Sequence, residues 1–365
     1  VQQFQSLADD INDDYKKLPQ FTASYRGDGT PFEWQPIGVA QYSNFDTDEN
    51  RVTGQRTYAE AGVAYPMQWT YGFLNSTVKY RQLNYELSDL RVLTDDSPSA
   101  GSALGSVDGG LFFERYTQIG DNRMLQTLEP RVYYLYSEYE DQTDQPDFDS
   151  AELTFTYNQL FRETRFSGRD RLDDANQVSV GLTTRFIDSG DGRDMFSASI
   201  GQIFYFRDRK VRLRPIDEPL GDTTSETAGE LTFSPNDNIG FSTSLVYDNN
   251  SGNMNSGFAR ATYSTDAGSL FNVGYSYRRP LTATFNQQVT EEAHFSSFLP
   301  LGNNWSLYGA INYSLESNQS VEDMFGVQYD TCCWTVRLLY LRYYNNVSGS
   351  NIIDFDDPDL ERENT

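Results

Sequence analysis

The residues of this chain best equipped for covalent chemistry are two adjacent cysteines, Cys332 and Cys333, within the stretch YDTCCWTVRLLYLRYY. The sequence of 365 residues contains no other cysteine. Adjacent Cα atoms lie about 3.8 Å apart across a trans peptide, whereas disulfides usually join Cα atoms about 4.4–6.8 Å apart. The two are therefore poor partners for each other. Either both are free thiols, or both bond to cysteines that this chain does not contain.

Other groups suited to catalysis are few. His294 is the one histidine of the chain, and although Ser296 and Ser297 follow it, neither a nucleophile elbow nor an oxyanion arrangement accompanies them. The sequence contains no glycine-rich phosphate loop and no paired metal-ligand motif. We therefore predict no enzymatic activity, no cofactor and no metal site, and interpret His294 as a structural residue.

A second candidate site is the arginine-rich stretch NQLFRETRFSGRDRLDDANQ, residues 158–177. It mixes apolar side chains with arginines, which predicts an ordered segment. Two interpretations remain open. The arginines pair internally with Asp170, Asp173 and Asp174, or they contact an anionic ligand or a plug protein. The candidate contact residues are Arg162, Arg165, Phe166, Gly168, Arg169, Asp170 and Arg171.

Bulk composition narrows the class of protein. Aromatic residues make up 15% of the chain and hydrophobic residues 38%, which suits a sheet with one aromatic face and one wet face better than a soluble enzyme core. The formal charge of −25 disfavours nucleic acid as a partner. No apolar run reaches the roughly 18 residues of a membrane-spanning helix. The polar start means that a signal peptide is absent or lies upstream of this chain.

Alternation of apolar and polar residues predicts strands almost everywhere. In FNVGYSYR, residues 271–278, Phe271, Val273 and Tyr275 alternate with polar or small residues. A helix cannot use this pattern, because neighbours on one helix face are three and four residues apart. The predicted strands run for about 9–15 residues, near the length that a tilted strand needs to cross a bilayer.

Connections alternate in length along the chain. Long, acidic or glycine-rich excursions separate short ones, which is typical of an outer-membrane barrel with short periplasmic turns and longer extracellular loops. We predict an all-β, transmembrane antiparallel β-barrel of about sixteen strands. A soluble propeller or β-helix is disfavoured, because no short repeat is present. The predicted short connections are 28–32, 65–72, 119–123, 188–194, 235–238, 265–268, 300–304 and 330–333, and the long ones are 47–55, 88–106, 140–176, 207–224, 249–255, 279–287 and 317–321.

The cysteine pair falls in one of the short connections, which places it on the periplasmic side. That compartment is oxidising, so exposed thiols would not normally stay free there. We therefore predict disulfides from Cys332 and Cys333 to a periplasmic partner domain. A buried pair of inert thiols is the alternative.

Three segments resemble the family of the LPS-assembly protein LptD, also called the organic solvent tolerance protein. They are GVQYDTCCWTVRLLYLR at 326–342, the stretch at 158–177, and LEPRVYYLY at 128–136. The resemblance implies an outer-membrane translocon of Gram-negative bacteria that inserts lipopolysaccharide into the outer leaflet. It implies a periplasmic jellyroll domain ahead of a barrel of about 26 strands, and an LptE-type lipoprotein that plugs the lumen.

The same resemblance implies roles and a route. Cys332 and Cys333 would bond to cysteines near the N-terminus and in the jellyroll. Lipopolysaccharide would arrive from a periplasmic bridge through the N-terminal domain, its acyl chains entering the membrane lipid through the seam between the first and last strands and its sugars passing through the lumen.

This sequence departs from the family pattern, since it lacks the jellyroll and the partner cysteines and ends in DDPDLERENT, which we interpret as a loop. We expect residues 1–365 to be part of one outer-membrane β-barrel domain, with the jellyroll, the first strands and the last strand outside this chain. The alternative function is a general porin-type diffusion channel, because about sixteen strands could close on their own. An outer-membrane phospholipase lacks a credible histidine site.

Overall fold

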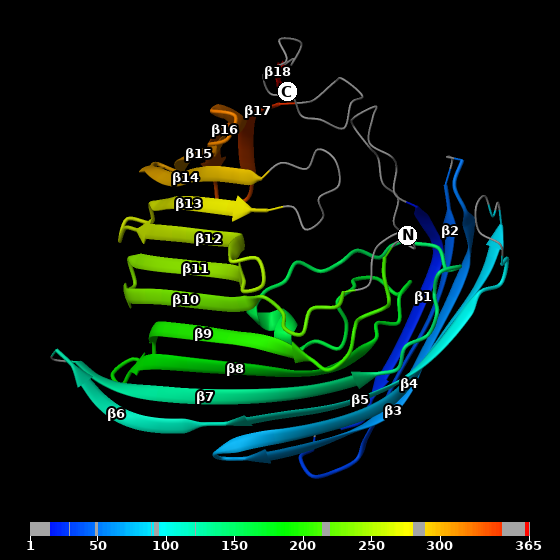
Figure 1. Cartoon of the computed structure of the whole chain (residues 1–365). Helices are drawn as coiled ribbons and strands as arrows, with labels where there is room; N and C mark the ends of the chain where they lie inside the picture. The colour runs from blue at the N-terminus through cyan, green and yellow to red at the C-terminus, as the bar shows by residue number, and fades with distance from the viewer. Residues whose placement is uncertain are drawn as a thin grey trace. The chain divides into compact units, whose positions relative to one another are not determined.

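The structure is a computed structural model that describes residues 15–28, 30–47, 50–88, 90, 95–120, 122–213, 220–279, 289–344 and 362–364 (Figure 1). It is all-β apart from one short 3-10 helix, η1 (Tyr157–Phe161). Within the described ranges no helix is long and apolar enough to cross a membrane. The chain divides into two compact units, which are described separately.

The first unit comprises residues 1–113, 128–182 and 201–225. Its strands pair antiparallel in chain order from β1 to β5, and β5 then pairs with the second half of β7, from Leu104 opposite Ser137 to Gly110 opposite Arg131. The strands that belong to it alone are β1 (Lys16–Arg26), β2 (Gln35–Asp46), β3 (Thr53–Trp69), β4 (Gly72–Ser88) and β5 (Ser99–Leu111).

The second unit comprises residues 114–127, 183–200 and 226–365. Strands β10 to β18 form an antiparallel meander in chain order. They are β10 (Thr227–Asn236), β11 (Ile239–Asp248), β12 (Asn253–Ser264), β13 (Leu270–Arg278), β14 (Thr290–Gly302), β15 (Trp305–Ser314), β16 (Gln319–Asp330), β17 (Thr335–Tyr344) and β18 (Arg362–Asn364). The strands with residues in both units are β6 (Phe113–Ile119), β7 (Asn122–Ser137), β8 (Ala175–Asp188) and β9 (Asp194–Tyr205).

The predicted alternation of connection lengths holds only in part. The connections 249–252 and 315–318, predicted to be long, are no longer than 265–269 and 331–334, which were predicted to be short. Strands β3 and β4 are joined through residues 70–71, β10 and β11 through 237–238, and β14 and β15 through 303–304, whereas residues 138–174 separate β7 from β8.

Several details differ from the sequence prediction. The strands run to β18, where about sixteen were predicted. Residues 99–106, predicted within a long connection, begin β5 because they pair with β4 residue by residue. Phe112 interrupts one expected strand and divides it into β5 and β6. Residues 362–364, expected in a loop, form β18 by pairing with the last residues of β17; the rest of that predicted loop lies outside the described residues.

The alternation of faces is confirmed. On β4, Leu83 and Tyr85 are buried while Val78 and Tyr80 are exposed. Because successive side chains of a strand point to opposite faces, each sheet region has one exposed apolar face. In the second unit, the exposed face carries Val273, Phe295, Ile311, Phe325 and Leu338.

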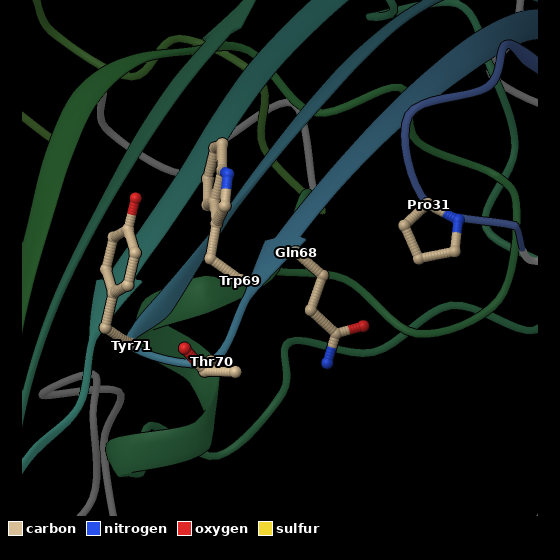
Figure 2. Close-up of a pocket in the computed structure, with 5 residues that line it drawn as sticks. All are labelled: Pro31, Gln68, Trp69, Thr70 and Tyr71. Atoms are coloured by element: carbon tan, nitrogen blue, oxygen red, sulfur yellow. The ribbon is translucent and has the colours of Figure 1, made fainter.

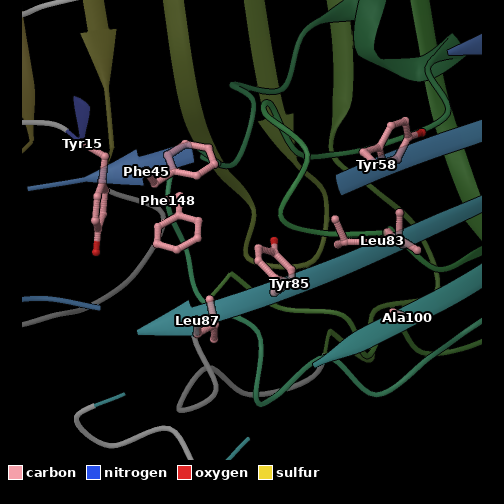
Figure 3. Close-up of a cluster of buried hydrophobic side chains, with 9 residues drawn as sticks. Tyr15, Phe45, Tyr58, Leu83, Tyr85, Leu87, Ala100 and Phe148 are labelled. Carbon is pink, nitrogen blue, oxygen red and sulfur yellow. The ribbon is translucent and has the colours of Figure 1, made fainter. Parts of the chain in front are cut away.

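The main hydrophobic cluster of the first unit lies on the other face of β2 to β5 (Figure 3). Phe148, from the long segment between β7 and β8, stacks on Phe45 with ring centroids 4.4 Å apart and meets Tyr85 at 6.0 Å. Leu172 of the same segment joins this cluster. The long segment therefore packs onto the strands as part of the core.

Candidate functional site

The long segment between β7 and β8, residues 138–174, is called the excursion from here on. It covers the buried face of β2 to β5 through an ionic anchor on β3. The guanidinium of Arg56, only 1% exposed, donates to Asp149 Oδ1 at 2.6 Å and to Asp170 Oδ1 at 2.5 Å. Lys17 Nζ on β1 lies 3.1 Å from Asp149 Oδ2. Because a buried charge must be paired, these contacts fix where the excursion meets the sheet.

Asp170 organises the backbone around this anchor. Besides Arg56, its carboxylate accepts a hydrogen bond from Tyr85 Oη at 2.8 Å. The backbone N–H groups of Phe148 and Asp149 donate to its other oxygen at 3.0 and 2.8 Å. These donors satisfy both oxygens of the fully buried carboxylate. Asp170 thus joins two parts of the excursion to two strands.

The two other aspartates near the anchor have pKa values that move in opposite directions. Burial of Asp149 favours its neutral form, but the hydrogen bond and charge of Arg56, with Lys17, outweigh burial and lower the pKa to about 2. Partial burial, followed by the negative charge of Asp170, raises the pKa of Asp147 to about 6. The excursion therefore contains one acid that strongly prefers to be ionised and one that titrates near neutral pH.

A second anchor is Arg81 on β4, which is also buried. Its Nη2 donates to Ser102 Oγ at 3.1 Å, to Ser137 Oγ at 2.6 Å and to the carbonyl of Asp173 at 3.1 Å. Arg81 therefore joins β4, β5 and β7 to the end of the excursion. Sequence analysis did not single out Arg56 or Arg81.

Two arginines that sequence analysis did single out make internal contacts. Arg165 Nη2 donates to Asp173 Oδ1 at 2.7 Å, which confirms part of the predicted internal pairing. Arg171 is buried, and its guanidinium donates to backbone carbonyls of the excursion and of the segment after β9. These acceptors are the carbonyls of Gln145, Pro146, Asp170, Arg212 and Leu213.

Helix η1 fits into gaps left by glycines on β8 and β9. Leu160 is fully buried, and a Cβ added to Gly201 would lie 2.5 Å from Leu160 Cδ1. A Cβ on Gly181 would lie 2.7 Å from both Phe161 and Tyr157. A Cβ essentially never lies this close to another heavy atom, so the side chains of η1 would have to move. The two glycines therefore leave the space into which the side chains of η1 pack.

The remaining candidate residues of the excursion divide into structural and accessible ones. Phe166 is buried. Gly168 has φ of 65°, and a Cβ there would lie 2.5 Å from the carbonyl oxygen of Asp149. Arg162 is exposed, and Arg169 is partly exposed with its guanidinium 4.3 Å from the centroid of the Tyr58 ring. Arg162 and Arg169 are the arginines of this stretch that are best placed to meet a ligand or partner.

The second unit carries a polar ladder across β13 to β16. Ser276 and His294 Nε2 are 2.8 Å apart, His294 Nδ1 lies 2.9 Å from Asn312 Oδ1, and Asn312 Nδ2 donates to Glu322 Oε2 at 3.1 Å. Since Asn312 presents its oxygen, His294 Nδ1 is the donor and Nε2 accepts from Ser276. The structural interpretation of His294 fits this arrangement.

The cysteine pair lies in the short connection 331–334, as expected from the sequence. Both thiols are exposed and free, with their Sγ atoms 2.9 Å apart. Thr331 and Trp334 close the turn through a backbone hydrogen bond of 2.9 Å. Exposure removes the alternative of a buried, inert pair. It leaves both thiols able to reach cysteines of another chain segment, and that pairing remains a prediction.

Comparison with known proteins places this geometry in a family. A family model described as "LptD: LPS transport system D" matches residues 1–305. A protein of Saccharophagus degradans named LPS-assembly protein LptD is 34% identical over 387 residues, which cover 100% of this chain and 44% of the relative. A protein of the same name from Alkalilimnicola ehrlichii is 35% identical, covering 96% of this chain and 46% of the relative. The chain thus spans less than half the length of these two relatives.

Solved structures with some likeness to the chain include transport proteins. The ferric enterobactin receptor of Pseudomonas aeruginosa aligns with a TM-score of 0.40 and 10% identity, over 89% of this chain and 56% of the receptor. The ferric preacinetobactin receptor of Acinetobacter baumannii aligns with a TM-score of 0.38 and 10% identity, over 89% of this chain and 61% of that receptor. Likeness at this level transfers neither function nor site residues.

Proposed function

Because the chain belongs to the LptD family of lipopolysaccharide transport proteins, we propose that it forms part of the outer-membrane β-barrel of a translocon that inserts lipopolysaccharide into the outer leaflet. The observation that carries this proposal is the amphipathic sheet of each unit, with an exposed apolar face opposite a polar one. In lipid, strands must pair all their backbone groups and turn apolar side chains outward. No chemical step is required of the protein.

In this proposal the polar face lines the lumen. The Ser276–His294–Asn312 ladder offers hydroxyl, imidazole and amide groups, which suits hydrated sugars. The excursion occupies the lumen beside β2 to β5 and narrows it. Arg162 and Arg169 are the excursion residues that we assign to the lipoprotein plug, of the LptE type, or to phosphorylated sugars. Arg165 and Arg171 support them by holding the segment in place.

The short connections face the periplasm in this proposal, and the long ones face the outside. Cys332 and Cys333 then lie where disulfides form. They bond to cysteines of the N-terminal periplasmic domain, outside this chain, which receives lipopolysaccharide from the periplasmic bridge. The porin alternative is not favoured, since the family match points to lipopolysaccharide transport.

The test uses the full-length protein in a cell whose own copy can be switched off. Wild type, Cys332→Ser, Cys333→Ser and the double variant are compared on non-reducing gels and for lipopolysaccharide at the cell surface, measured with an impermeant label. The double variant should lose a reductant-sensitive mobility shift and most of the newly delivered surface lipopolysaccharide. Unchanged delivery after depletion of every functional copy would contradict the proposal. Single-channel conductance of the purified protein without a plug would favour the porin.

A further inference from the structure

The segment after β9, residues 206–213, is called the strap from here on, and it concentrates positive charge in an acidic chain. The sequence holds 28 lysine and arginine residues against 53 aspartate and glutamate residues, yet the strap reads FRDRKVRL. Its basic residues are Arg207, Arg209, Lys210 and Arg212, and its one acidic residue is Asp208. A local excess of positive charge attracts anions.

Hydrogen bonds hold the backbone of the strap in place within the first unit. The N–H group of Phe206 donates to the carbonyl of Asn176 at 2.8 Å. The buried carboxylate of Asp174 accepts from the N–H groups of Lys210 and Val211 at 3.1 and 2.9 Å. A ligand would therefore meet side chains on an ordered backbone, which lowers the entropy cost of binding.

Three cations of the strap lie against tyrosine rings. The distances from the cation to the ring centroid are 5.3 Å for Arg207 and Tyr136, 3.4 Å for Arg209 and Tyr205, and 5.2 Å for Lys210 and Tyr139. Among the residues that the structure describes, no carboxylate forms an ion pair with these three side chains. A ring attracts a cation without neutralising it, so all three charges remain available to an anion.

Arg209 gives the strongest indication of an anion site. It is only 3% exposed, and its Nε atom, like that of Arg207, is buried without a hydrogen-bond partner. Arg207 donates through Nη2 to the carbonyl of Ser137. In the same unit, the equally buried Arg56 has two aspartates as partners. Burial of a charged donor costs free energy unless an acceptor replaces water, and an anion at the strap would supply that acceptor.

Aromatic surface accompanies these charges. Arg207 and Lys210 both lie beside rings at the end of β7 and just after it, Tyr136 and Tyr139. Both rings are exposed, as is the ring of Phe206 on the strap itself. A ligand that carries its negative charge next to a sugar or an apolar group would therefore find a surface for both parts.

The hollow of about 600 Å³ at the β3–β4 connection lacks this combination. Figure 2 shows Trp69 and Tyr71 side by side at that connection. The lining consists of Pro31, Gln68, Trp69, Thr70 and Tyr71 and contains no charged side chain. Rings are present there without a counter-charge for an anion, whereas the strap combines exposed rings with cations that have no carboxylate partner.

We propose that Arg207, Arg209 and Lys210 form a binding site for a phosphate ester, and that the ligand is a phosphorylated glycolipid. Arginine presents a planar fork of N–H donors that fits phosphate oxygens, and lysine adds a compact charge. The inference deepens the proposed function, since the choice of a glycolipid rests on it. In the proposed orientation the strap belongs to a long connection, so it meets the phosphates of lipopolysaccharide on the outer side of the membrane.

The test uses the purified full-length protein in detergent, with a photoactivatable phenylalanine analogue in place of Phe206 as a local reporter. The probes are lipopolysaccharide and lipopolysaccharide treated with phosphatase, with inorganic phosphate as a competitor. Cross-linking should fall at least about tenfold after phosphatase treatment, because the site then loses its charge-assisted hydrogen bonds.

The variant Arg207→Gln/Lys210→Gln should lower the cross-linking of untreated lipopolysaccharide to a similar extent. The matched control is Arg193→Gln, which removes a cation that already has a partner, Asp237, 2.5 Å away. It should leave cross-linking unchanged.

The outcomes separate this site from the proposed function. No cross-link in the unsubstituted site, or equal cross-linking after phosphatase treatment or in the double variant, would overturn the phosphate site. Displacement of lipopolysaccharide by inorganic phosphate at equal concentration would show that the site takes free phosphate, and the glycolipid would be wrong. Either result leaves the proposed function intact as long as delivery of lipopolysaccharide to the cell surface depends on the protein. Loss of that dependence would refute the function itself.

Discussion

The polar faces of β3–β5 and of β13–β16 differ in what they contact, although both arise from the same alternation of residues. The first carries Arg56 and Arg81, which are buried beneath the excursion. The second carries His294, whose side chain is 30% exposed in its ladder. Strand periodicity therefore defines which face is polar. It does not decide whether water or another part of the chain satisfies that face.

The physical difference lies in charge. A guanidinium removed from water needs anionic partners, because burial of an unpaired charge is very costly. The excursion supplies Asp149 and Asp170 to Arg56, whereas Arg81 donates to two serine hydroxyls and to the carbonyl of Asp173. In the ladder, serine, histidine, asparagine and Glu322 side chains instead satisfy one another across neighbouring strands and keep contact with water. The first face therefore holds a specific segment of the chain, and the second is a partly exposed polar surface.

The largest expected effect comes from Arg56→Ala, which should undock the excursion from β3. It leaves Asp149 and Asp170 without their main partner, which we expect to cost about 3–5 kcal/mol of docking free energy. Hydrogen exchange across residues 140–174 of the purified full-length protein should rise by orders of magnitude, and cells should take up more of a small hydrophilic drug.

Arg260→Ala is the matched control for that variant, since Arg260 is an exposed arginine of β12. It should leave exchange in the excursion unchanged. Equal effects of the two substitutions would mean that the buried pair does not hold the excursion.

A steric change should loosen the excursion less. Gly201→Ala brings a Cβ within 2.5 Å of Leu160 Cδ1 and 2.6 Å of the carbonyl of Val180, and such overpacking costs about 1–3 kcal/mol. We expect faster exchange confined to η1 and its neighbours. Gly229→Ala on β10 is the control, because its nearest atom would lie 3.7 Å away. If Gly201→Ala and Gly229→Ala change hydrogen exchange in η1 equally, the packing of η1 does not depend on the missing side chain of Gly201.

Acidification should first strengthen slightly, and then weaken, the docking of the excursion. The pKa of Asp149 is lowered to about 2, so its contribution of about 2 kcal/mol is present above pH 4 and is lost as pH falls from about 4 to 2. The pKa of Asp147 is raised to about 6, so its protonation between about pH 6 and 4 slightly favours the docked state, an effect weakened by solvent screening.

Limited proteolysis of the excursion as a function of pH checks this. Protection should rise a little towards pH 4 and then fall. Asp147→Asn should remove the rise alone. A monotonic loss of protection starting near pH 6 would contradict the opposite effects assigned to protonation of Asp147 and of Asp149.

The smallest effect belongs to the ladder. His294→Ala removes two hydrogen bonds from a partly exposed site, where water can replace them, so we expect a loss of less than about 1 kcal/mol. The thermal midpoint should shift slightly, and exchange in the excursion should not change. A loss of free energy as large as that caused by Arg56→Ala would show that the ladder is as important to stability as the buried Arg56 pair.

The fold could be predicted well from sequence because strand patterning is local. Val180 and Leu182 alternate with Ser179 in the printed sequence, and the structure exposes the first two and buries the third. The arginine-rich stretch was found from its composition. Its anchors were not, because the partners of Arg56 lie 93 and 114 residues away along the chain, and a single arginine on a strand gives no signal of such a pairing.

The sequence by itself determined most of the strands, the long connection between β7 and β8, the placement of Cys332 and Cys333 in a turn, and the family. Each depends on neighbouring residues or on a contiguous motif. Only the tertiary structure decided that Arg165 pairs with Asp173 and that Arg171 is buried while Arg162 remains accessible, and that Arg56 pairs with two aspartates of the excursion. Those outcomes depend on which distant charges meet in a space closed to water, where an unpaired partner is too costly to leave.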